Sequence, residues 1–242
     1  TEIGKLLDTN GGCSLPCWWG ISPNKTPWPQ ALHFLNPLLV HVGQGSIQDY
    51  SKDGKKHIET NFSVAFEVPA ISKQGRIDFG IRDDVIVGMS VFPPVTEYGY
   101  QLHELLALLG LPKQVFINAQ SSSPISELPP TVLTLDYSDV GVWASYGYIP
   151  STDGKYLVIC PKSLKESKTI IDYENLGGRL VLFDTTDDHD RMLSIEEYAE
   201  MWGGFTAKKL EEVTDMTTES FYNTFIQPKS ETCLKTPAEL WP

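Results

Sequence analysis

The segment IETNFSVAFEV (residues 58–68) decides the fold class, because apolar and polar side chains alternate along it. Successive side chains of a β-strand point to opposite faces of a sheet. One face of this strand therefore carries Ile58, Thr60, Phe62, Val64, Phe66 and Val68. The pattern predicts a strand with one buried face and one solvated face, as antiparallel sheets have.

The regions on both sides of this segment extend the prediction. The stretch RIDFGIRDDVIVGMSVF (residues 76–92) contains two apolar runs that meet at residues 82–84, which predicts a hairpin turn. The stretch TPWPQALHFLNPLL (residues 26–39) has the signals of a helix, with Thr26 as the N-cap and Pro37 as the end. The first half is thus predicted to form a helix followed by about three antiparallel strands.

The second half of the chain repeats this order. The stretch EYGYQLHELLALLGLP (residues 97–112) predicts a helix, because Leu102, Leu105, Leu106 and Leu109 form an apolar stripe at helical spacing. Gly110 and Pro112 are its stop signals. Extended segments are predicted after it, at residues 113–119, 131–150 and 154–161. A repeated order of helix and strands indicates two related units.

We therefore predict an α+β fold in which helices pack on one face of an antiparallel sheet. Two tandem helix-then-strands units are expected, at residues 1–95 and 96–165. The first unit begins with a clasp rich in cysteine and tryptophan. Residues 166–242 are expected to form a C-terminal extension that packs on the same body.

The composition limits the classes of partner. The chain has 242 residues and a net charge of −12, from 19 Lys and Arg against 31 Asp and Glu. Such an acidic surface repels nucleic acid and argues against docking on anionic lipid through basic residues. No apolar run reaches the roughly 18 residues of a membrane-spanning helix, so we expect no transmembrane segment. The sequence begins at Thr1 and not at a methionine, which indicates a processed start. An export signal or a lipid anchor is therefore open upstream of it.

Cysteine usage indicates export. The chain has four cysteines, Cys13, Cys17, Cys160 and Cys233, and four cysteines allow three pairings. We favour Cys13–Cys17 and Cys160–Cys233, in which the second bridge ties the C-terminal tail to a strand that ends in YLVIC. Disulfides persist in oxidising compartments, so this pairing predicts a location outside the cytoplasm; reduced cytosolic thiols are the alternative.

The clasp GGCSLPCWWGISPNKTPWPQAL (residues 11–32) admits four interpretations: a metal site, a redox site, a ligand cradle or a structural clasp. A zinc site needs two further ligands, and the C-x-x-x-C spacing differs from the C-x-x-C of thioredoxin-like sites. We favour a local disulfide against which Trp18 and Trp19 pack. Adjacent residues of an extended segment point to opposite sides, so one of these tryptophans is a candidate for an exposed anchor.

No catalytic residue and no cofactor are predicted. The sequence lacks a G-x-S-x-G nucleophile elbow, both glycine-rich nucleotide motifs and the H-E-x-x-H zinc motif. A pair of catalytic carboxylates remains open, because such pairs meet only in space. The candidates for contact with a protein partner are aromatic: Trp18, Trp19, Trp28, Tyr98 and Tyr100.

The acidic segment DTTDDHD (residues 184–190) is the candidate for a metal site. Its carboxylates, Asp184, Asp187, Asp188 and Asp190, are of the kind that calcium prefers. The segment lacks the D-x-D-x-D-G pattern of an EF-hand loop and its downstream glutamate. A solvated acidic loop is therefore the favoured interpretation.

Two segments of the chain carry a resemblance. The stretch CSLPCWWGISPNKTPWPQALHFL, with its C-x-x-P-C-W-W-G-I-x-P core, and the tail CLKTPAELWP resemble a group of uncharacterised exported bacterial proteins. The motif LLGLP, after a helix and before strands, is similar to one in small outer-membrane assembly lipoproteins of the SmpA/OmlA kind and in the beta-lactamase-inhibitor-protein fold. The first resemblance implies export, and the second implies protein binding.

These observations predict a non-catalytic binding module outside the cytoplasm. It would be secreted, at the cell surface or tethered to a membrane, as an accessory or assembly subunit of an envelope or surface complex. Its partner would be a protein. A secreted hydrolase acting on glycan or peptide and a structural subunit of a filament or surface layer are the alternatives.

Overall fold

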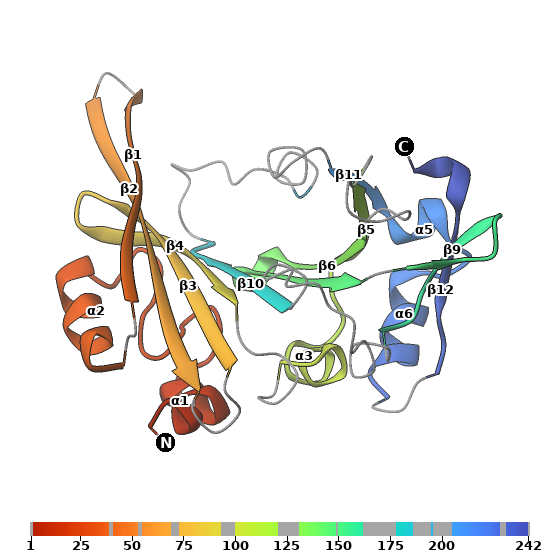
Figure 1. Cartoon of the computed structure of the whole chain (residues 1–242), viewed down its shortest axis with the longest axis horizontal. Helices are drawn as coiled ribbons and strands as arrows, with labels where there is room; N and C mark the ends of the chain where they lie inside the picture. Colours follow the sequence, from red (N-terminus) through yellow and green to blue (C-terminus); the bar gives the residue numbers. More distant parts are fainter. Residues whose placement is uncertain are drawn as a thin grey trace. The chain divides into compact units, whose positions relative to one another are not determined.

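The computed structural model describes residues 2–38, 41–52, 55–68, 73–92, 100–120, 131–148, 150–161, 178–185, 195, 205–227 and 231–241. The chain divides into two compact units. Unit 1 comprises Thr1–Gly99, Ser138–Trp143 and Arg179–Asp187, and unit 2 comprises Tyr100–Tyr137, Ala144–Gly178 and Asp188–Pro242. Both units contain antiparallel strands and helices, so the predicted α+β class is confirmed (Figure 1).

The strands of unit 1 form an antiparallel sheet. In spatial order they are β1 (His41–Lys52), β2 (Lys55–Val68), β3 (Lys73–Arg82), β4 (Val85–Phe92) and β10 (Gly178–Phe183). Strand β10 lies far along the chain from β4 but pairs directly with it, with Leu180 opposite Val91. The predicted tandem division into residues 1–95, 96–165 and 166–242 stays a prediction.

The alternation of residues 58–68 produces the core of unit 1. Phe62 pairs with Phe79 and Val64 pairs with Ile77 across β2 and β3, so all four side chains share one face. Val64, Ile77 and Phe79 are buried, and Phe62 is half-buried. Burying such side chains is the main favourable term in folding.

The predicted hairpin between β3 and β4 is confirmed. Asp83 and Asp84 form its turn, with φ angles of 49° and 62°. A two-residue hairpin with positive φ at both central positions matches the right-handed twist of the strands, and Asp tolerates this conformation better than most residues.

Four short helical segments precede the sheet in unit 1: α1 (Glu2–Thr9), η1 (Asn10–Gly12), α2 (Trp28–Leu35) and η2 (Asn36–Leu38). The expected N-cap at Thr26 is wrong, because α2 begins two residues later, after Pro27. The Thr26 hydroxyl instead accepts a 2.9 Å hydrogen bond from the Ser22 backbone amide. Among the helices that the structure describes, none has the length and apolar character that crossing a membrane requires.

Unit 2 has a larger sheet and a smaller one. The larger sheet has the order β7 (Val142–Tyr148), β6 (Thr131–Tyr137), β5 (Gln114–Gln120) and β11 (Phe205–Lys209). The first two residues of β7, and η3 (Ser138–Val140) before it, belong to unit 1. The smaller sheet has the order β12 (Leu234–Pro237), β9 (Tyr156–Ile159) and β8 (Ser151–Thr152), and η5 (Ala238–Leu240) follows it. The helices of this unit are α3 (Leu102–Leu109), α5 (Leu210–Val213) and α6 (Thr218–Phe225).

Helix α3 confirms part of the prediction for residues 97–112. Its described bounds begin at Leu102, and Gly110 follows it with a φ of 81°. The Gly110 carbonyl accepts a 2.9 Å hydrogen bond from the hydroxyl of Tyr137 in β6, which ties the end of the helix to the sheet. Leu105 and Leu106 are fully buried.

Both predicted disulfides are present. Cys13 is bonded to Cys17, and Cys160, directly after β9, is bonded to Cys233, directly before β12. The bridges span 4 and 73 residues of sequence. In the chain-entropy model, the longer bridge stabilises by about 4.5 kcal/mol and the shorter by about 2 kcal/mol.

We expect the two bridges to differ in their effect on stability. Replacement of Cys160 and Cys233 by serine should lower the free energy of unfolding, measured in urea, by about twice as much as replacement of Cys13 and Cys17. Mass spectrometry after thiol alkylation of the unreduced wild-type protein should find no alkylated cysteine. Four alkylated cysteines would contradict both bridges.

A second prediction concerns the close approach of β2 and β3. Gly75 lies opposite Phe66, and a Cβ at position 75 would overlap the Phe66 ring, which is fully buried. We expect Gly75→Ala to lower the free energy of unfolding by about 1–3 kcal/mol, because the ring must leave its packed position. Gly88→Ala in β4 is the matched control, since its Cβ would meet only a carbonyl oxygen at 3.6 Å. Equal urea midpoints for the two variants would contradict this account.

Candidate functional site

The clasp is organised around the side chain of Asn10, which is almost fully buried. Its Nδ2 donates hydrogen bonds to the carbonyls of Cys13 (2.9 Å) and Cys17 (2.7 Å). Its Oδ1 accepts one from the backbone amide of Trp19 at 3.0 Å. One amide side chain thus holds both ends of the disulfide loop and the start of the next turn.

That turn is a tight hairpin of Trp18, Trp19, Gly20 and Ile21. The backbone groups of Trp18 and Ile21 exchange hydrogen bonds of 2.8 and 2.9 Å. Trp19 and Gly20 have φ angles of 54° and 83°. Gly20 adopts this conformation without cost, but for Trp19 it costs on the order of 1–3 kcal/mol.

Aromatic packing offsets this cost. The Trp19 ring lies 5.8 Å from that of Trp18 and meets Phe66 of β2 edge-on at 5.0 Å. Burial of about 200 Å² of indole surface contributes roughly 5 kcal/mol, which exceeds the backbone strain. Trp28, from α2, packs on the same face, 4.7 Å from Phe62 and 5.4 Å from Phe79.

The burial of these rings corrects the expectation of an exposed tryptophan. Trp18, Trp19 and Trp28 expose 0, 3 and 8% of their surfaces. The two adjacent rings do not face opposite sides, because the backbone between them is a tight turn and not an extended strand. A role of these tryptophans in partner binding stays untested, and their burial removes the physical argument for it.

The tyrosine candidates fall in unit 2 or outside the described residues. Tyr98 lies outside them. Tyr100 is buried, and its carbonyl accepts a 2.9 Å hydrogen bond from the Tyr146 hydroxyl. Burial raises the pKa of Tyr100 to about 12, because the phenolate would be poorly solvated. Tyr100 is therefore part of the core of its unit.

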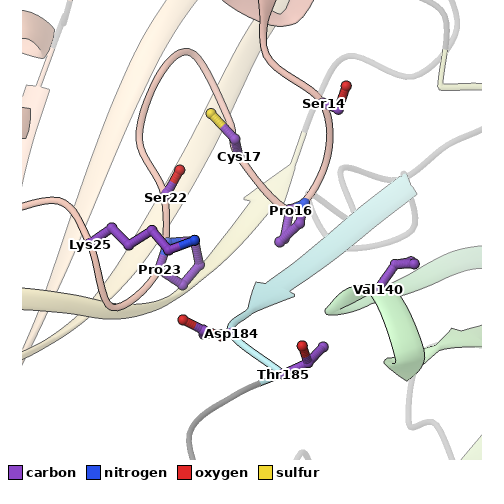
Figure 2. A pocket seen from close by; sticks show the side chains of 9 residues that line it. All are labelled: Ser14, Pro16, Cys17, Ser22, Pro23, Lys25, Val140, Asp184 and Thr185. Atoms are coloured by element: carbon purple, nitrogen blue, oxygen red, sulfur yellow. The ribbon is translucent and has the colours of Figure 1, made fainter.

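A pocket of about 320 Å³ opens beside the clasp within unit 1. Figure 2 shows its nine lining side chains, which come from the clasp, from η3 and from the end of β10. They are Ser14, Pro16, Cys17, Ser22, Pro23, Lys25, Val140, Asp184 and Thr185. The strand pairing of β10 with β4 and the packing of the clasp on the sheet bring these segments together.

The pocket combines apolar walls with polar groups. Two proline rings, the cystine and Val140 supply apolar surface, and Lys25 and Asp184 supply one charge of each sign. Within the part of the chain that the structure describes, the hydroxyls of Ser14, Ser22 and Thr185 and the ammonium of Lys25 have no protein partner. Such groups are available to bind a polar ligand that also presents an apolar surface.

Gly141 shapes the wall of the pocket beside Val140. Its φ is 73°, and its carbonyl accepts a 3.0 Å hydrogen bond from the amide of Phe183. A Cβ at this position would overlap the Phe183 carbonyl and lie 3.3 Å from Pro16. Only glycine allows η3, β10 and the clasp to approach one another this closely.

The candidate metal ligands lie only partly within the described residues. Asp184 lines the pocket, whereas Asp187, Asp188 and Asp190 lie outside the described residues. No group of three or more metal-ligating side chains occurs in the portion of the chain that the structure describes. Calcium binding by residues 184–190 stays a prediction.

Sequence reasoning identified the clasp but missed most of the pocket. Ser14, Ser22 and Lys25 are short or exposed polar residues with no motif of their own. Val140 and Thr185 are more than a hundred residues away along the chain. No local pattern could have joined these segments, because their proximity depends on a pairing between distant strands.

Comparisons of this chain with family models, with curated proteins and with solved structures found no match. The resemblance of the clasp and tail to exported bacterial proteins, and that of LLGLP to SmpA/OmlA-type lipoproteins, stay predictions.

A substitution of Asn10 tests its role in organising the clasp. We expect Asn10→Asp to lower the free energy of unfolding by roughly 2–3 kcal/mol, because a carboxylate keeps the acceptor for Trp19 but loses both donors to the cysteine carbonyls. Asn36→Asp, at an exposed position after α2, is the control. It should change the free energy of unfolding by less than about 0.5 kcal/mol. Urea unfolding monitored by tryptophan fluorescence measures both. A wild-type midpoint for Asn10→Asp would contradict the role assigned to Asn10.

Proposed function

We propose that the protein is a non-catalytic binding module that acts outside the cytoplasm, as an accessory or assembly subunit of a membrane-associated or cell-surface complex. One observation carries this proposal. The Cys13–Cys17 disulfide closes the loop from which Ser14, Pro16 and Cys17 line the pocket. A cross-linked wall keeps its shape without a ligand, so little ordering entropy is lost on binding.

The two disulfides support the proposed location. Both close within one unit each and use all four cysteines of the chain. Such bonds persist where the surroundings are oxidising, as in secreted, periplasmic and surface proteins. The net charge of −12 keeps such a module soluble at high local concentration.

The size and lining of the pocket support a protein partner. Its volume of about 320 Å³ lies at the lower end of the range of ligand pockets, roughly 300–1,000 Å³. A space of this size accepts one large side chain or a short loop. The hydroxyls and the Lys25 ammonium can bind a polar side-chain end, while the prolines contact its apolar part.

Co-purification from native membranes tests the proposal. Val140 is 47% exposed at the pocket, so Val140→Arg should fill the pocket and leave the fold intact. Leu108→Arg is the matched control, because Leu108 is 62% exposed on α3 and outside the pocket. We expect the wild type and Leu108→Arg to retain a stoichiometric protein partner and Val140→Arg to lose it by at least about tenfold.

Three results would contradict the proposal in different ways. Equal recovery of the partner by Val140→Arg would exclude the pocket as its binding site. A lone protein that turns over glycan or peptide would favour the secreted hydrolase. Ordered self-assembly of the native material would favour the structural subunit of a filament or surface layer.

A further inference from the structure

The sheet of unit 1 carries a second polar site, on the face opposite to the clasp tryptophans. Ile77 and Phe79 of β3 face the buried side, so Arg76 and Asp78, which alternate with them, face the other side. Side chains from the adjacent strands β2, β4 and β10 complete a group that we call the arginine cluster: Ser63, Arg76, Asp78, Ser90, Phe92 and Arg179.

Two guanidinium groups in this cluster share one aromatic ring. Arg76 lies directly across from Phe92 in the pairing of β3 with β4, and its Cζ is 4.1 Å from the centroid of the Phe92 ring. The Cζ of Arg179, on the other side of β4 in the sheet order, is 5.1 Å from the same centroid. A guanidinium that stacks on a ring in this way is held in place, keeps its charge and can still donate hydrogen bonds from its N–H groups.

An ion pair orients Arg76, and a hydrogen bond orients Arg179. The Nε of Arg76 lies 3.2 Å from an Asp78 carboxylate oxygen, which also accepts a 2.8 Å hydrogen bond from the Ser63 hydroxyl. The Nη2 of Arg179 donates a 2.8 Å hydrogen bond to the Ser90 hydroxyl. The side chains of Arg76 and Asp78 remain 35 and 30% exposed, so the cluster is held in place and still reachable.

The chemistry of the cluster favours a carboxylate. A guanidinium presents a planar fork of donors that matches the two oxygens of a carboxylate. The contact between Arg76 and Asp78 uses one Nε and one carboxylate oxygen, so it is an ion pair and not a forked contact. Both arginines are already ordered by stacking. Binding of a carboxylate therefore costs less arginine side-chain entropy than it would at a mobile arginine.

The net charge of the chain disfavours a densely charged source of the anion more than a sparsely charged one. At −12, the protein as a whole repels a surface dense in negative charge, such as an anionic membrane. A short acidic peptide segment carries few charges, and it can lie along strands whose outer face presents the two arginines. We propose that the arginine cluster binds the carboxylate side chains of an acidic segment of a protein partner.

This inference extends the proposed function, since it supplies the chemistry of a partner at a surface separate from the clasp pocket. Its test uses the purified full chain and a synthetic hexaglutamate peptide, titrated by calorimetry at physiological ionic strength, where the long-range repulsion by the net charge is screened. Val140→Arg, which blocks the pocket, should bind the peptide like the wild type. The titration therefore tests binding at the arginine cluster independently of partner binding at the pocket.

Substitutions within the cluster should weaken peptide binding. We expect Arg76→Gln and Arg179→Gln each to lower the affinity about tenfold, because each removes a charge-assisted donor pair. Arg82→Gln is the matched control: it removes an arginine of the same strand about 20 Å further along, and it should change the affinity less than about twofold. Arg76→Lys and Arg179→Lys keep the charge and the fold but lose the fork, so they should lower the affinity by an intermediate factor.

Several outcomes would overturn the proposal. One is that the wild type shows no saturable binding of the peptide. A second is that Arg82→Gln lowers the affinity for the peptide as much as Arg76→Gln and Arg179→Gln do. A third is that the lysine variants bind the peptide as tightly as the wild type. Tighter binding of inorganic phosphate, or of vesicles containing anionic phospholipid, than of the hexaglutamate peptide would assign the site to another anion.

Discussion

The contact between the clasp tryptophans and the aromatic face of the unit 1 sheet is the constraint on which the rest of this unit depends. Trp19 packs on Phe66, and Trp28 packs on Phe62 and Phe79. The backbone between these tryptophans is then fixed against the start of β4, where the Ile86 amide donates to the Thr26 carbonyl at 3.1 Å. The unfavourable backbone of Trp19 persists because the buried surface contributes more than the strain costs.

This packing separates the structural residues of unit 1 from those that remain available for function. The three tryptophans of the clasp are buried in the core, whereas the pocket and the arginine cluster present hydroxyl groups, the Lys25 ammonium and two stacked arginines. Arg179 of β10 belongs to the arginine cluster, and Asp184 and Thr185, directly after β10, line the pocket. A strand added from a distant part of the sequence thus completes both candidate surfaces.

The features that the sequence predicts correctly are those set by neighbouring residues. The alternation of residues 58–68, the Asp83–Asp84 turn and the stop at Gly110 each express a local rule of backbone geometry, and the structure contains all three. Helix α1 is short, and β1 is rich in glycine and polar residues, so neither gave a clear periodic signal.

The features that sequence reasoning missed depend on contacts between distant segments. The expected exposure of a tryptophan failed because a turn replaced the extended segment on which the argument relied. The pocket could not be foreseen, since residues 14–25, 140 and 184–185 meet only after β10 pairs with β4. The arginine cluster likewise joins Arg76 and Arg179 through that pairing.

The bond between Cys160 and Cys233 has a consequence for the integrity of the chain. The segment Arg179–Asp187, which carries most of β10 into unit 1, lies between these two cysteines in the chain, so it is enclosed in a covalent ring. A protease that cuts one peptide bond anywhere in the ring leaves a single molecule of nearly unchanged mass, and the fragments separate only after reduction. A single cut by a protease therefore releases neither the tail nor the strand that completes the sheet of unit 1.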